Sequence, residues 1–442
     1  MPEPIGNGDS GGGLALEGWR LSGLKEIAVI GSGISGLAAA YYLSRRHRVT
    51  LYEREARLGG HTHTVAVETP AGPLPVDTGF IVHNTRSYPN LVRLLAELKV
   101  PTAESDMSFS VRDEHSGFEY SSRGLRGFFA QRETLFHTRQ YELLREIHRF
   151  NGAARAVLGR ERPEQPDAST LEDFLGRERF SSSFTRNYLY PLASAIWSTA
   201  TGQIGAFPAT TLFRFFENHG MLQLTRHIRW RTIPRGSSSY IEPITAPFRE
   251  RIVRSAQIAG IERGERSVRV NCTGGAGAEF DEVVLACHGN QALELLANPN
   301  ETERAVLGAF CTTANEAVLH TDSRLLPRTP WGRASWNYHL DGDAAPGATL
   351  TYHMNRLQAL PATQDFCVTL NANGSVDPTK VLRRFVYHHP LYTLEAVRAQ
   401  RRWAEISGRD RVHYCGAYWM FGFHEDGLNS GMRVARALGV EC

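Results

Sequence analysis

Near its start the chain has short apolar runs with a helical stretch between them. Residues 27–30 are all apolar, as in a parallel strand that is buried on both faces. An Ala-rich helical stretch follows at 37–43, and a second apolar run at 49–52 ends at Glu53. Strand, helix and strand in this order predict a βαβ unit, which joins two parallel strands.

The rest of the chain alternates between helical and strand-like patterns. Its first part predicts a strand at 76–82, a helix at 89–98, a hairpin at 107–120, an arginine-rich helical stretch at 125–158 and a mostly helical aromatic stretch at 174–230. Its later part predicts a helix at 240–248, strands at 252–253, 258–261, 268–272 and 281–287, a helix at 292–309, strands within 317–355 and at 367–370, a last strand at 412–416, and a helix from Gly427. The strands between 252 and 287 are expected to complete the sheet that the βαβ unit begins, so an insertion splits this sheet.

A chain of 442 residues is too long for one simple core and predicts two domains. The fold class is α/β, and the nucleotide-binding domain is expected to be of Rossmann type, with an interleaved α+β substrate domain. We assign residues 25–100, 235–295 and 405–442 to the first domain and residues 101–234 and 296–404 to the second. The polar, Gly-rich residues 1–24 predict a disordered tail.

Three glycines after the first strand make a GxGxxG motif, in which each glycine has a separate mechanical role. Gly31 makes the tight turn, Gly33 lets a pyrophosphate approach the backbone, and Gly36 lets the helix pack closely on the strand. The free N–H groups of the helix N-terminus favour phosphate. Glu53, 22 residues after Gly31, is placed to accept hydrogen bonds from a ribose. The motif therefore predicts dinucleotide binding.

A second glycine pair, Gly59-Gly60, follows Glu53 and Arg54 and precedes His61. This run resembles the extension found in flavoproteins of the glutathione-reductase and amine-oxidase type, in which the second pair also approaches the pyrophosphate. The resemblance implies that the cofactor is FAD rather than NAD.

Many separate motifs together resemble the amine-oxidase-type FAD superfamily over nearly everything after Leu24. They are similar above all to a bacterial family of FAD-binding oxidoreductases allied to cyclopropane- and furan-fatty-acid metabolism. The motifs are GSGISGLAAAYYL and LGGHTHTV within 31–65, VDTGFIVHNTRSYPNL at 76–91, SDMSFSV at 105–111, AIWSTA at 195–200, FRFFENHG at 213–220, ACHGNQAL at 286–293, HMNRLQ at 353–358 and YCGAYWMFGFHEDGLNSG at 414–431. The resemblance implies redox chemistry on a lipid-like substrate, with desaturation of an unsaturated or branched fatty acyl chain by hydride transfer to flavin N5.

The same resemblance supplies the expected cofactor contacts, with FAD bound non-covalently. They are Gly31, Gly33, Ser35, Gly36, Glu53, Arg54, Gly59, Gly60, His61, Thr62, Gly416, Asp426, Gly427 and Leu428. A covalent link through Cys415 is not expected, because its neighbours lack the usual attachment context.

Desaturation also needs an acceptor for the second hydrogen, which leaves as a proton. His424 and Glu425 are the first choice for acid/base or flavin-tuning roles, since their segment resembles the stretch that contacts the flavin in the family. In the alternative interpretation Glu425 and Asp426 cap the terminal helix and touch the ribityl chain. His83 and His353 are weaker candidates.

Two features argue against amine oxidation. True amine oxidases of this superfamily keep a lysine, bridged by water to flavin N5, in the later substrate-domain sheet, whereas here only Lys380 lies in the later chain, in a predicted turn. Phe423 occupies what resembles an aromatic-cage tyrosine position and lacks the hydroxyl group. Three hypotheses remain: a fatty acyl desaturase, a redox-neutral FAD-dependent isomerase of polyunsaturated fatty acids, and a flavin-bound, non-catalytic partner of a lipid methyltransferase.

Composition and charge limit the ligands and the cellular compartment that we expect for this chain. A net charge of +3 gives no reason to expect nucleic-acid binding. The six cysteines are scattered and show no metal-ligand spacing, so we expect no metal site and a reducing, cytoplasmic compartment. No apolar run reaches the length of a membrane span. The arginine-rich stretch at 125–158 is either a basic surface for anionic lipid heads, with peripheral membrane contact, or a solvated helix face backed by core.

Overall fold

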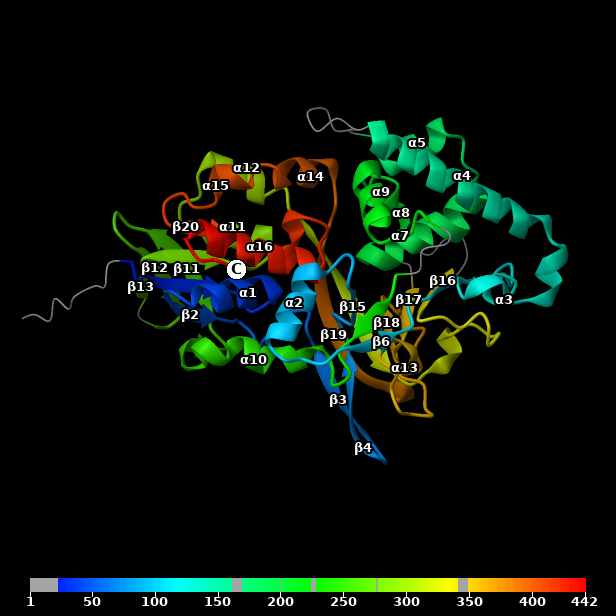
Figure 1. Cartoon of the computed structure of the whole chain (residues 1–442), viewed down its shortest axis with the longest axis horizontal. Coiled ribbons are helices and arrows are strands. Elements are labelled where there is room, and N and C mark those ends of the chain that lie inside the picture. Colours follow the sequence, from blue (N-terminus) through cyan, green and yellow to red (C-terminus); the bar gives the residue numbers. More distant parts are fainter. Residues whose placement is uncertain (1–22, 161–168, 200, 224–227, 276, 341–348) are drawn as a thin grey trace, which may run out of the picture.

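The computed structural model of the chain describes residues 23–160, 169–199, 201–223, 228–275, 277–340 and 349–442, and Figure 1 shows their arrangement. The predicted tail at residues 1–24 therefore lies almost wholly outside the described residues.

A five-stranded parallel sheet carries the nucleotide-binding unit. In spatial order its strands are β10 (Ile252–Val253), β2 (Arg48–Tyr52), β1 (Glu26–Ile30), β14 (Glu282–Leu285) and β20 (Val412–Tyr414). Helix α1 (Ile34–Leu43) joins β1 to β2, so the predicted βαβ unit is confirmed. Helix α16 (His424–Ala437) starts three residues before the predicted Gly427 and lies against α1. The backbones come close because Gly431 is opposite α1, where an added Cβ would be 2.4 Å from the Ser35 carbonyl oxygen.

The prediction for residues 258–272 was wrong in part. Strands β11 (Ile258–Arg263), β12 (Val268–Cys272) and β13 (Ala278–Phe280) form their own antiparallel sheet instead of joining the parallel one. Short connections let these strands pair with their neighbours in sequence, and such hairpins close a smaller loop than a parallel crossover does.

A seven-stranded mixed sheet forms the second half of the molecule. Its order is β19 (Val381–Pro390), β15 (Thr312–His320), β18 (Cys367–Leu370), β17 (Thr349–His353), β16 (Trp336–Leu340), β7 (Phe109–Asp113) and β8 (Glu119–Ser121). The predicted hairpin at 107–120 is confirmed as β7 and β8. Strand β19 was not predicted. Smaller sheets contain β3 (Thr64–Thr69) with β4 (Gly72–Asp77), and β5 (Val82–Asn84), β9 (Trp230–Thr232) and β6 (Ala103–Ser105).

The helical elements follow the predicted stretches in part: the stretch predicted at 125–158 is divided into α3, a 3₁₀ turn and α4, and α14 and α15 were not predicted. The remaining helices are α2 (Pro89–Glu97), α3 (Gly124–Phe128), α4 (Thr138–Arg160), α5 (Leu171–Arg177), α6 (Ser182–Phe184) continuing as a π-helical turn (Thr185–Leu189), α7 (Tyr190–Trp197), α8 (Thr201–Ile204), α9 (Ala209–Asn218), α10 (Ile241–Thr245), α11 (Gly289–Leu295), α12 (Glu301–Leu307), α13 (Met354–Leu357), α14 (Leu394–Gln400) and α15 (Trp403–Ile406). The single helix predicted at 292–309 is two, because Asn300 starts α12 with a capping box that it shares with Glu303.

Two large apolar cores underlie this arrangement. One surrounds the parallel sheet, with residues such as Val29, Leu51 and Val284 fully buried. The other collects the aromatic side chains of residues 109–222 and the seven-stranded sheet. Phe423, just before α16, packs against both. The boundaries assigned to the two domains stay a prediction.

Candidate functional site

One large cavity, of about 1270 Å³, runs between the two cores. At one end it is lined by the loops that follow β1 and β2; we call this the dinucleotide end. At the other it is lined by side chains of β7, α7, α9, β16 and β17; we call this the aromatic end. The volume exceeds the roughly 300–1,000 Å³ of an ordinary small-ligand site, so the cavity has room for more than one ligand.

The dinucleotide end contains a backbone cradle. Gly31 has φ of +105° and would place an added Cβ 2.9 Å from the Ala286 carbonyl oxygen, so this turn requires glycine. Gly33 lines the cavity, and a Cβ added there would meet no atom within 4 Å. The N-terminus of α1 begins directly after Gly33, where its free N–H groups favour anions. This open space beside a helix N-terminus fits a pyrophosphate.

Glu53 is held beside this cradle by backbone and side-chain donors. Its Oε2 accepts hydrogen bonds from the Ser32 backbone N–H at 2.9 Å and from Ser32 Oγ at 2.5 Å. The Glu55 backbone N–H donates to its Oε1 at 2.9 Å. Glu53 lines the cavity at the end of β2, so its carboxylate is fixed where the motif predicted a ribose contact.

The second glycine pair lies against the first glycine turn. The Gly59 backbone N–H donates to the Ser32 carbonyl oxygen at 3.1 Å, and a Cβ on Gly60 would be 3.1 Å from Gly33 Cα. The guanidinium of Arg57, which sequence reasoning missed, donates to the carbonyl oxygens of Gly60 at 2.8 Å and Thr62 at 3.1 Å. Both glycine motifs therefore face one space, although 26 residues separate Gly33 from Gly59.

The structure brings most of the expected cofactor contacts together and leaves others out. Gly31, Gly33, Ser35, Glu53, Arg54, Gly59, Gly60, His61 and Gly416 line the cavity. Gly36, Thr62, Asp426, Gly427 and Leu428 do not.

The residues left out have packing or hydrogen-bonding roles. A Cβ on Gly36 would be 1.9 Å from the Gly31 carbonyl oxygen, and one on Gly427 would be 2.6 Å from Ile34 Cγ2, so these glycines allow close packing around α1. Leu428 is fully buried in the core. Asp426 accepts from the Phe423 backbone N–H at 2.9 Å and caps α16, as the alternative interpretation expected for this residue.

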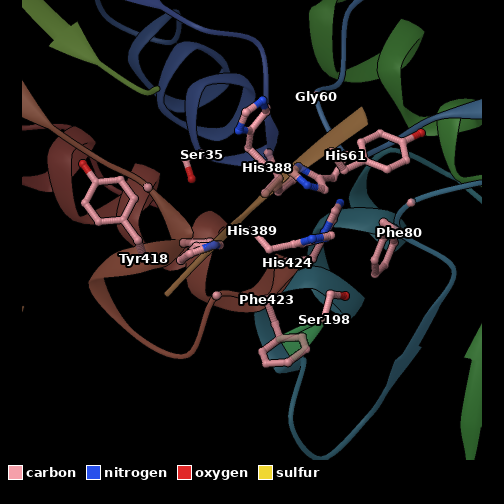
Figure 2. Close-up of a pocket in the computed structure, with 18 of the residues that line it drawn as sticks. Ser35, Gly60, His61, Phe80, Ser198, His388, His389, Tyr418, Phe423 and His424 are labelled. Atoms are coloured by element: carbon pink, nitrogen blue, oxygen red, sulfur yellow. The ribbon is translucent and has the colours of Figure 1, made fainter. Parts of the chain in front are cut away.

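The two predicted catalytic residues occupy different environments. His424 lines the cavity and stacks on Phe80, with ring centroids 3.6 Å apart (Figure 2). Its Nε2 pairs with Thr62 Oγ1 at 2.9 Å and Tyr240 OH at 3.3 Å. Burial lowers the pKa of His424 to about 3, so the ring is uncharged at neutral pH.

Glu425 is turned away from the cavity. Its carboxylate accepts from the backbone N–H groups of Asn90 at 3.0 Å and Leu91 at 2.9 Å, and from the Asn90 side chain. Those donors belong to the first turn of α2, so Glu425 caps a helix that is distant in sequence. Glu425 thus caps α2 and does not line the cavity, and its expected catalytic role stays a prediction.

The weaker histidine candidates do not line the cavity. His83 is buried on β5, and burial lowers its pKa to about 4. His353 pairs with Asp365 through Nε2 at 3.0 Å. Cys415 is fully buried and is also absent from the cavity wall.

Sequence reasoning missed a group of histidines that the fold assembles. The ring centroids of His61, from the second glycine loop, and His389 of β19 are 5.2 Å apart (Figure 2). Those of His388 and His288 are 6.4 Å apart. Burial lowers the pKa of His288 and His389 to about 4 and that of His61 well below its usual value. These three rings are therefore uncharged at neutral pH. In the sequence, the adjacent pair His388-His389 was the available indication of this group. Within the described part of the chain, no group of three or more His, Cys, Asp or Glu residues is arranged to hold a metal ion.

The aromatic end is lined by uncharged side chains. Among those that the structure describes are Phe109, Leu192, Trp197, Phe215, Trp336 and Tyr352. Other aromatic residues of the same stretch, such as Phe213 and Phe216, belong to the core. The aromatic-rich segment therefore contributes some residues to the cavity wall and others to the core. None of the three lysines of the chain, all of which are described, lines the cavity; Lys380 is in a short 3₁₀ segment near Asp322.

His219 is a further cavity residue without an assigned role in the sequence prediction. Its Nδ1 lies 2.9 Å from the Phe215 carbonyl oxygen. Because a carbonyl only accepts, Nδ1 carries the hydrogen and the lone pair is on Nε2. Burial lowers the pKa of His219 to about 4, so this ring is also uncharged at neutral pH.

No helix in the described ranges is both long enough and apolar enough to cross a bilayer.

Comparisons with known proteins agree with this geometry. The family model described as flavin containing amine oxidoreductase matches residues 34–439. A sequence comparison with curated proteins gives no significant match. Among solved structures, putrescine oxidase bound to putrescine is similar with a TM-score of 0.67 at 14% identity, over 94% of this chain and 98% of that chain.

Two further solved structures differ in the chemistry that their names state. The CLA-producing fatty acid isomerase from P. acnes has a TM-score of 0.67 at 16% identity, and the putative protoporphyrinogen oxidase from Exiguobacterium sp. 255-15 has 0.65 at 16% identity. Each comparison covers 93% of this chain and 98% of the other. At these identities the similarities establish a shared fold.

Proposed function

This chain belongs to the flavin containing amine oxidoreductase family and is an FAD-dependent oxidoreductase, and within that family we propose that it dehydrogenates a fatty acyl chain. The finer resemblance to proteins of cyclopropane- and furan-fatty-acid metabolism favours an unsaturated or branched chain as the substrate.

The uncharged aromatic end of the cavity is the observation that carries this proposal. In the described structure, the carboxylates on the cavity wall are Glu53 and Glu55, from the loop after β2, and Glu294 of α11, beside the dinucleotide end. A cationic amine buried among Trp197, Phe215 and their neighbours would have no counter-ion, and an unpaired buried charge is costly. A hydrocarbon chain needs no such partner and gains from burial.

The residues at the cavity support this reaction in three ways. When bound, FAD supplies the hydride acceptor of the reaction. The cradle of Gly33 and Gly60 leaves room for the pyrophosphate, and Glu53 is oriented for the ribose. The apolar wall excludes water from the reacting carbons. The N-terminus of α16, at His424, turns the positive end of a helix dipole toward the wall, where negative charge is stabilised.

Among the uncharged histidines of the cavity wall, we consider His424 and His219 for the proton that dehydrogenation releases. His424 is the residue expected from the sequence, but its Nε2 is already paired with Thr62 and Tyr240. His219 keeps its lone pair on Nε2. We assign His424 to orienting or tuning the flavin and His219 to proton acceptance.

An anaerobic absorption measurement tests the proposed function. The purified yellow protein is mixed with bacterial phospholipids, with free unsaturated fatty acids and, as the matched control, with putrescine. Bleaching of the flavin band by a lipid alone supports acyl dehydrogenation. Bleaching by putrescine alone overturns the proposal in favour of amine oxidation.

The redox-neutral isomerase is the second candidate, because the chain shares its fold with a fatty acid isomerase over most of its length. That reaction would move a double bond without lasting bleaching of the flavin. Mass spectrometry of the recovered fatty acids separates the two: new double bonds indicate dehydrogenation, and displaced ones indicate isomerisation. A flavin that no lipid perturbs would favour the non-catalytic methyltransferase partner.

A further inference from the structure

We propose that the corner formed by α3, the 3₁₀ turn Arg132–Phe136, the start of α4 and the loop around Trp331 docks on an anionic lipid bilayer, beside the mouth of the cavity. We call this surface the α3–α4 corner. Figure 1 places α3 at the end of the molecule opposite the five-stranded sheet. Docking itself is independent of the proposed function, whereas delivery of an acyl chain from the bilayer into the cavity rests on it.

The corner gathers exposed apolar side chains. Nine large apolar side chains are exposed in the described part of the chain, and five of them are here: Leu125, Leu135, Phe136, Tyr141 and Trp331. Phe136 is 89% exposed and Leu125 is 76% exposed. Contacts link the elements that display them, since Tyr141 packs on Phe129 of the segment after α3 and donates a hydrogen bond to the Leu135 carbonyl oxygen. Such a concentration marks an interaction surface.

The charge around these side chains is mainly positive. Residues 123–145 contain five arginines and two glutamates, Glu133 and Glu142. The guanidinium groups of Arg123 and Arg126 lie 5.6 and 5.4 Å from the Trp331 ring centroid. An indole ring with arginines around it suits the interface between lipid head groups and acyl chains. This charge complements anionic head groups, which is why we choose a bilayer over a protein partner.

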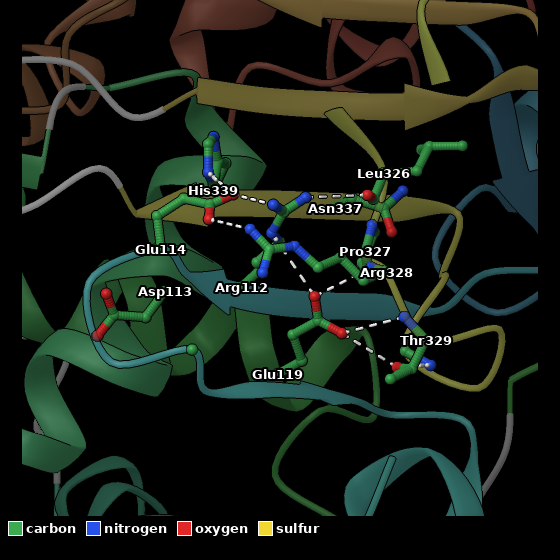
Figure 3. A network of polar contacts seen from close by, with 12 residues as sticks. Arg112, Asp113, Glu114, Glu119, Leu326, Pro327, Arg328, Thr329, Asn337 and His339 are labelled. Carbon is green, nitrogen blue, oxygen red and sulfur yellow. Dashed lines mark hydrogen bonds and ion pairs between the residues drawn. The ribbon is translucent and has the colours of Figure 1, made fainter. Parts of the chain in front are cut away.

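The loop that displays Trp331 is fixed to the seven-stranded sheet by a buried ionic network (Figure 3). Arg112 contacts Glu114 and lies 3.6 Å from Glu119, and it donates to the Leu326 carbonyl oxygen at 3.2 Å. Glu119 accepts from the backbone N–H groups of Arg328 at 2.9 Å and Thr329 at 3.2 Å.

A second set of contacts holds the tip of the same loop. The Ser121 hydroxyl donates to the Trp331 carbonyl oxygen at 2.7 Å, and Arg123 donates to the Pro330 carbonyl oxygen at 3.5 Å. These hydrogen bonds therefore fix the loop that carries the exposed indole, although the indole itself is not buried in the core.

The cavity reaches the surface beside this corner. Ser122, two residues before α3, is exposed and lines the cavity. Its backbone N–H donates to the Phe109 carbonyl oxygen at 2.7 Å, Phe109 is opposite Trp336, and Trp336 is opposite Tyr352. All four line the cavity, so one row from the residue after β8 across β7, β16 and β17 leads inward over three strand spacings, roughly 14 Å. An acyl chain would enter over this row while its head group stays at the membrane.

Vesicle sedimentation of the full-length yellow protein tests the docking. Vesicles of phosphatidylglycerol and phosphatidylcholine are compared with vesicles of phosphatidylcholine alone. We expect binding to the anionic vesicles that weakens with salt, because exposed charges are screened. The double variant Leu125→Ser/Phe136→Ser is expected to lower the partition coefficient about tenfold or more. Arg126→Glu should lower it about fivefold for each unit of charge changed.

Matched controls come from the other end of the molecule. Leu24→Ser removes an apolar side chain that is 40% exposed, and Arg249→Glu reverses an exposed charge. Both should bind as the unsubstituted protein does. Retained flavin colour and thermal stability show that the corner variants are folded. Equal sedimentation of corner and control variants, or no binding of the unsubstituted protein, would overturn the docking surface.

A second readout separates this inference from the proposed function. Corner variants should slow flavin reduction by vesicle lipids and leave reduction by detergent-dispersed lipids unchanged. Equal slowing with both lipid forms would overturn delivery at the corner. Intact vesicle binding with a flavin that no lipid perturbs would support the surface and refute the lipid substrate.

Discussion

Replacing Gly33 should separate cofactor binding from folding. Gly33 has φ of −63° and ψ of 172°, which any residue adopts, and a Cβ there would meet no protein atom within 4 Å. Gly33→Ala is therefore expected to leave the apoprotein as stable as before, or to stabilise it by about 0.4–1 kcal/mol through the unfolded chain. The added methyl group would extend into the space that fits the pyrophosphate.

The cost to FAD binding follows from that occupied space. Forcing one extra methyl group into a packed contact costs about 1–3 kcal/mol. This corresponds to a Kd about 5- to 150-fold higher. Gly33→Val adds two more methyl groups and should yield colourless protein. Fluorescence titration of apoprotein with FAD measures the affinity, and thermal unfolding without FAD measures the stability.

Replacing Gly36, three residues after Gly33, should have the opposite effect on the stability of the apoprotein. A Cβ on Gly36 would be 1.9 Å from the Gly31 carbonyl oxygen and 3.1 Å from Ala286 Cβ, so Gly36→Ala should destabilise the apoprotein itself. The reasoning is refuted if Gly33→Val is yellow and fully loaded, or if Gly33→Ala loses stability without FAD. A Gly36→Ala variant as stable as the unsubstituted protein would likewise contradict the described packing.

Three further predictions concern the ionisable groups around the cavity. Glu425→Ala should lower the free energy of unfolding by about 1–3 kcal/mol, because two N–H groups of α2 lose their acceptor, and it should change the rate of flavin reduction little. Urea titration measures the stability and stopped-flow absorption measures flavin reduction. A variant that is stable but inactive would support a catalytic role for Glu425. His424→Gln should slow flavin reduction by less than about tenfold, whereas a loss of about 100- to 10,000-fold would mark a general base. Stability should fall as the pH drops from about 6.5 toward 4, because the histidines bind protons in the unfolded chain and stay uncharged when they are buried in the folded protein. Burial raises the pKa values of Asp77 and Asp426 to about 7, which has the opposite effect on stability, but these two groups are fewer than the buried histidines. A flat profile of unfolding temperature against pH would contradict the described burial.

Local patterns account for the parts of the site that come from contiguous residues. Gly31, Gly33 and Glu53 lie within one βαβ unit, so their spacing alone places them around a common turn. The sequence also indicates the break between α11 and α12, since Asn300 and Glu303 have the spacing of a capping box, although the prediction gave one continuous helix. Strand β19 was missed because Arg383 and Arg384 interrupt its apolar alternation. Its pairing along the whole of β15 compensates for that interruption.

The sequence by itself determined the nucleotide-binding unit and the FAD family, because those depend on residue type and near neighbours. Only the tertiary structure decided that Glu425 caps α2, that His61 meets His389, and that Phe109, Trp336 and Tyr352 form one row. The cap depends on how α16 packs against α2, and the aromatic row depends on which strands pair and in what register. Register is set by burial of one face of the whole sheet, so it is a property of the assembled core and not of any single segment.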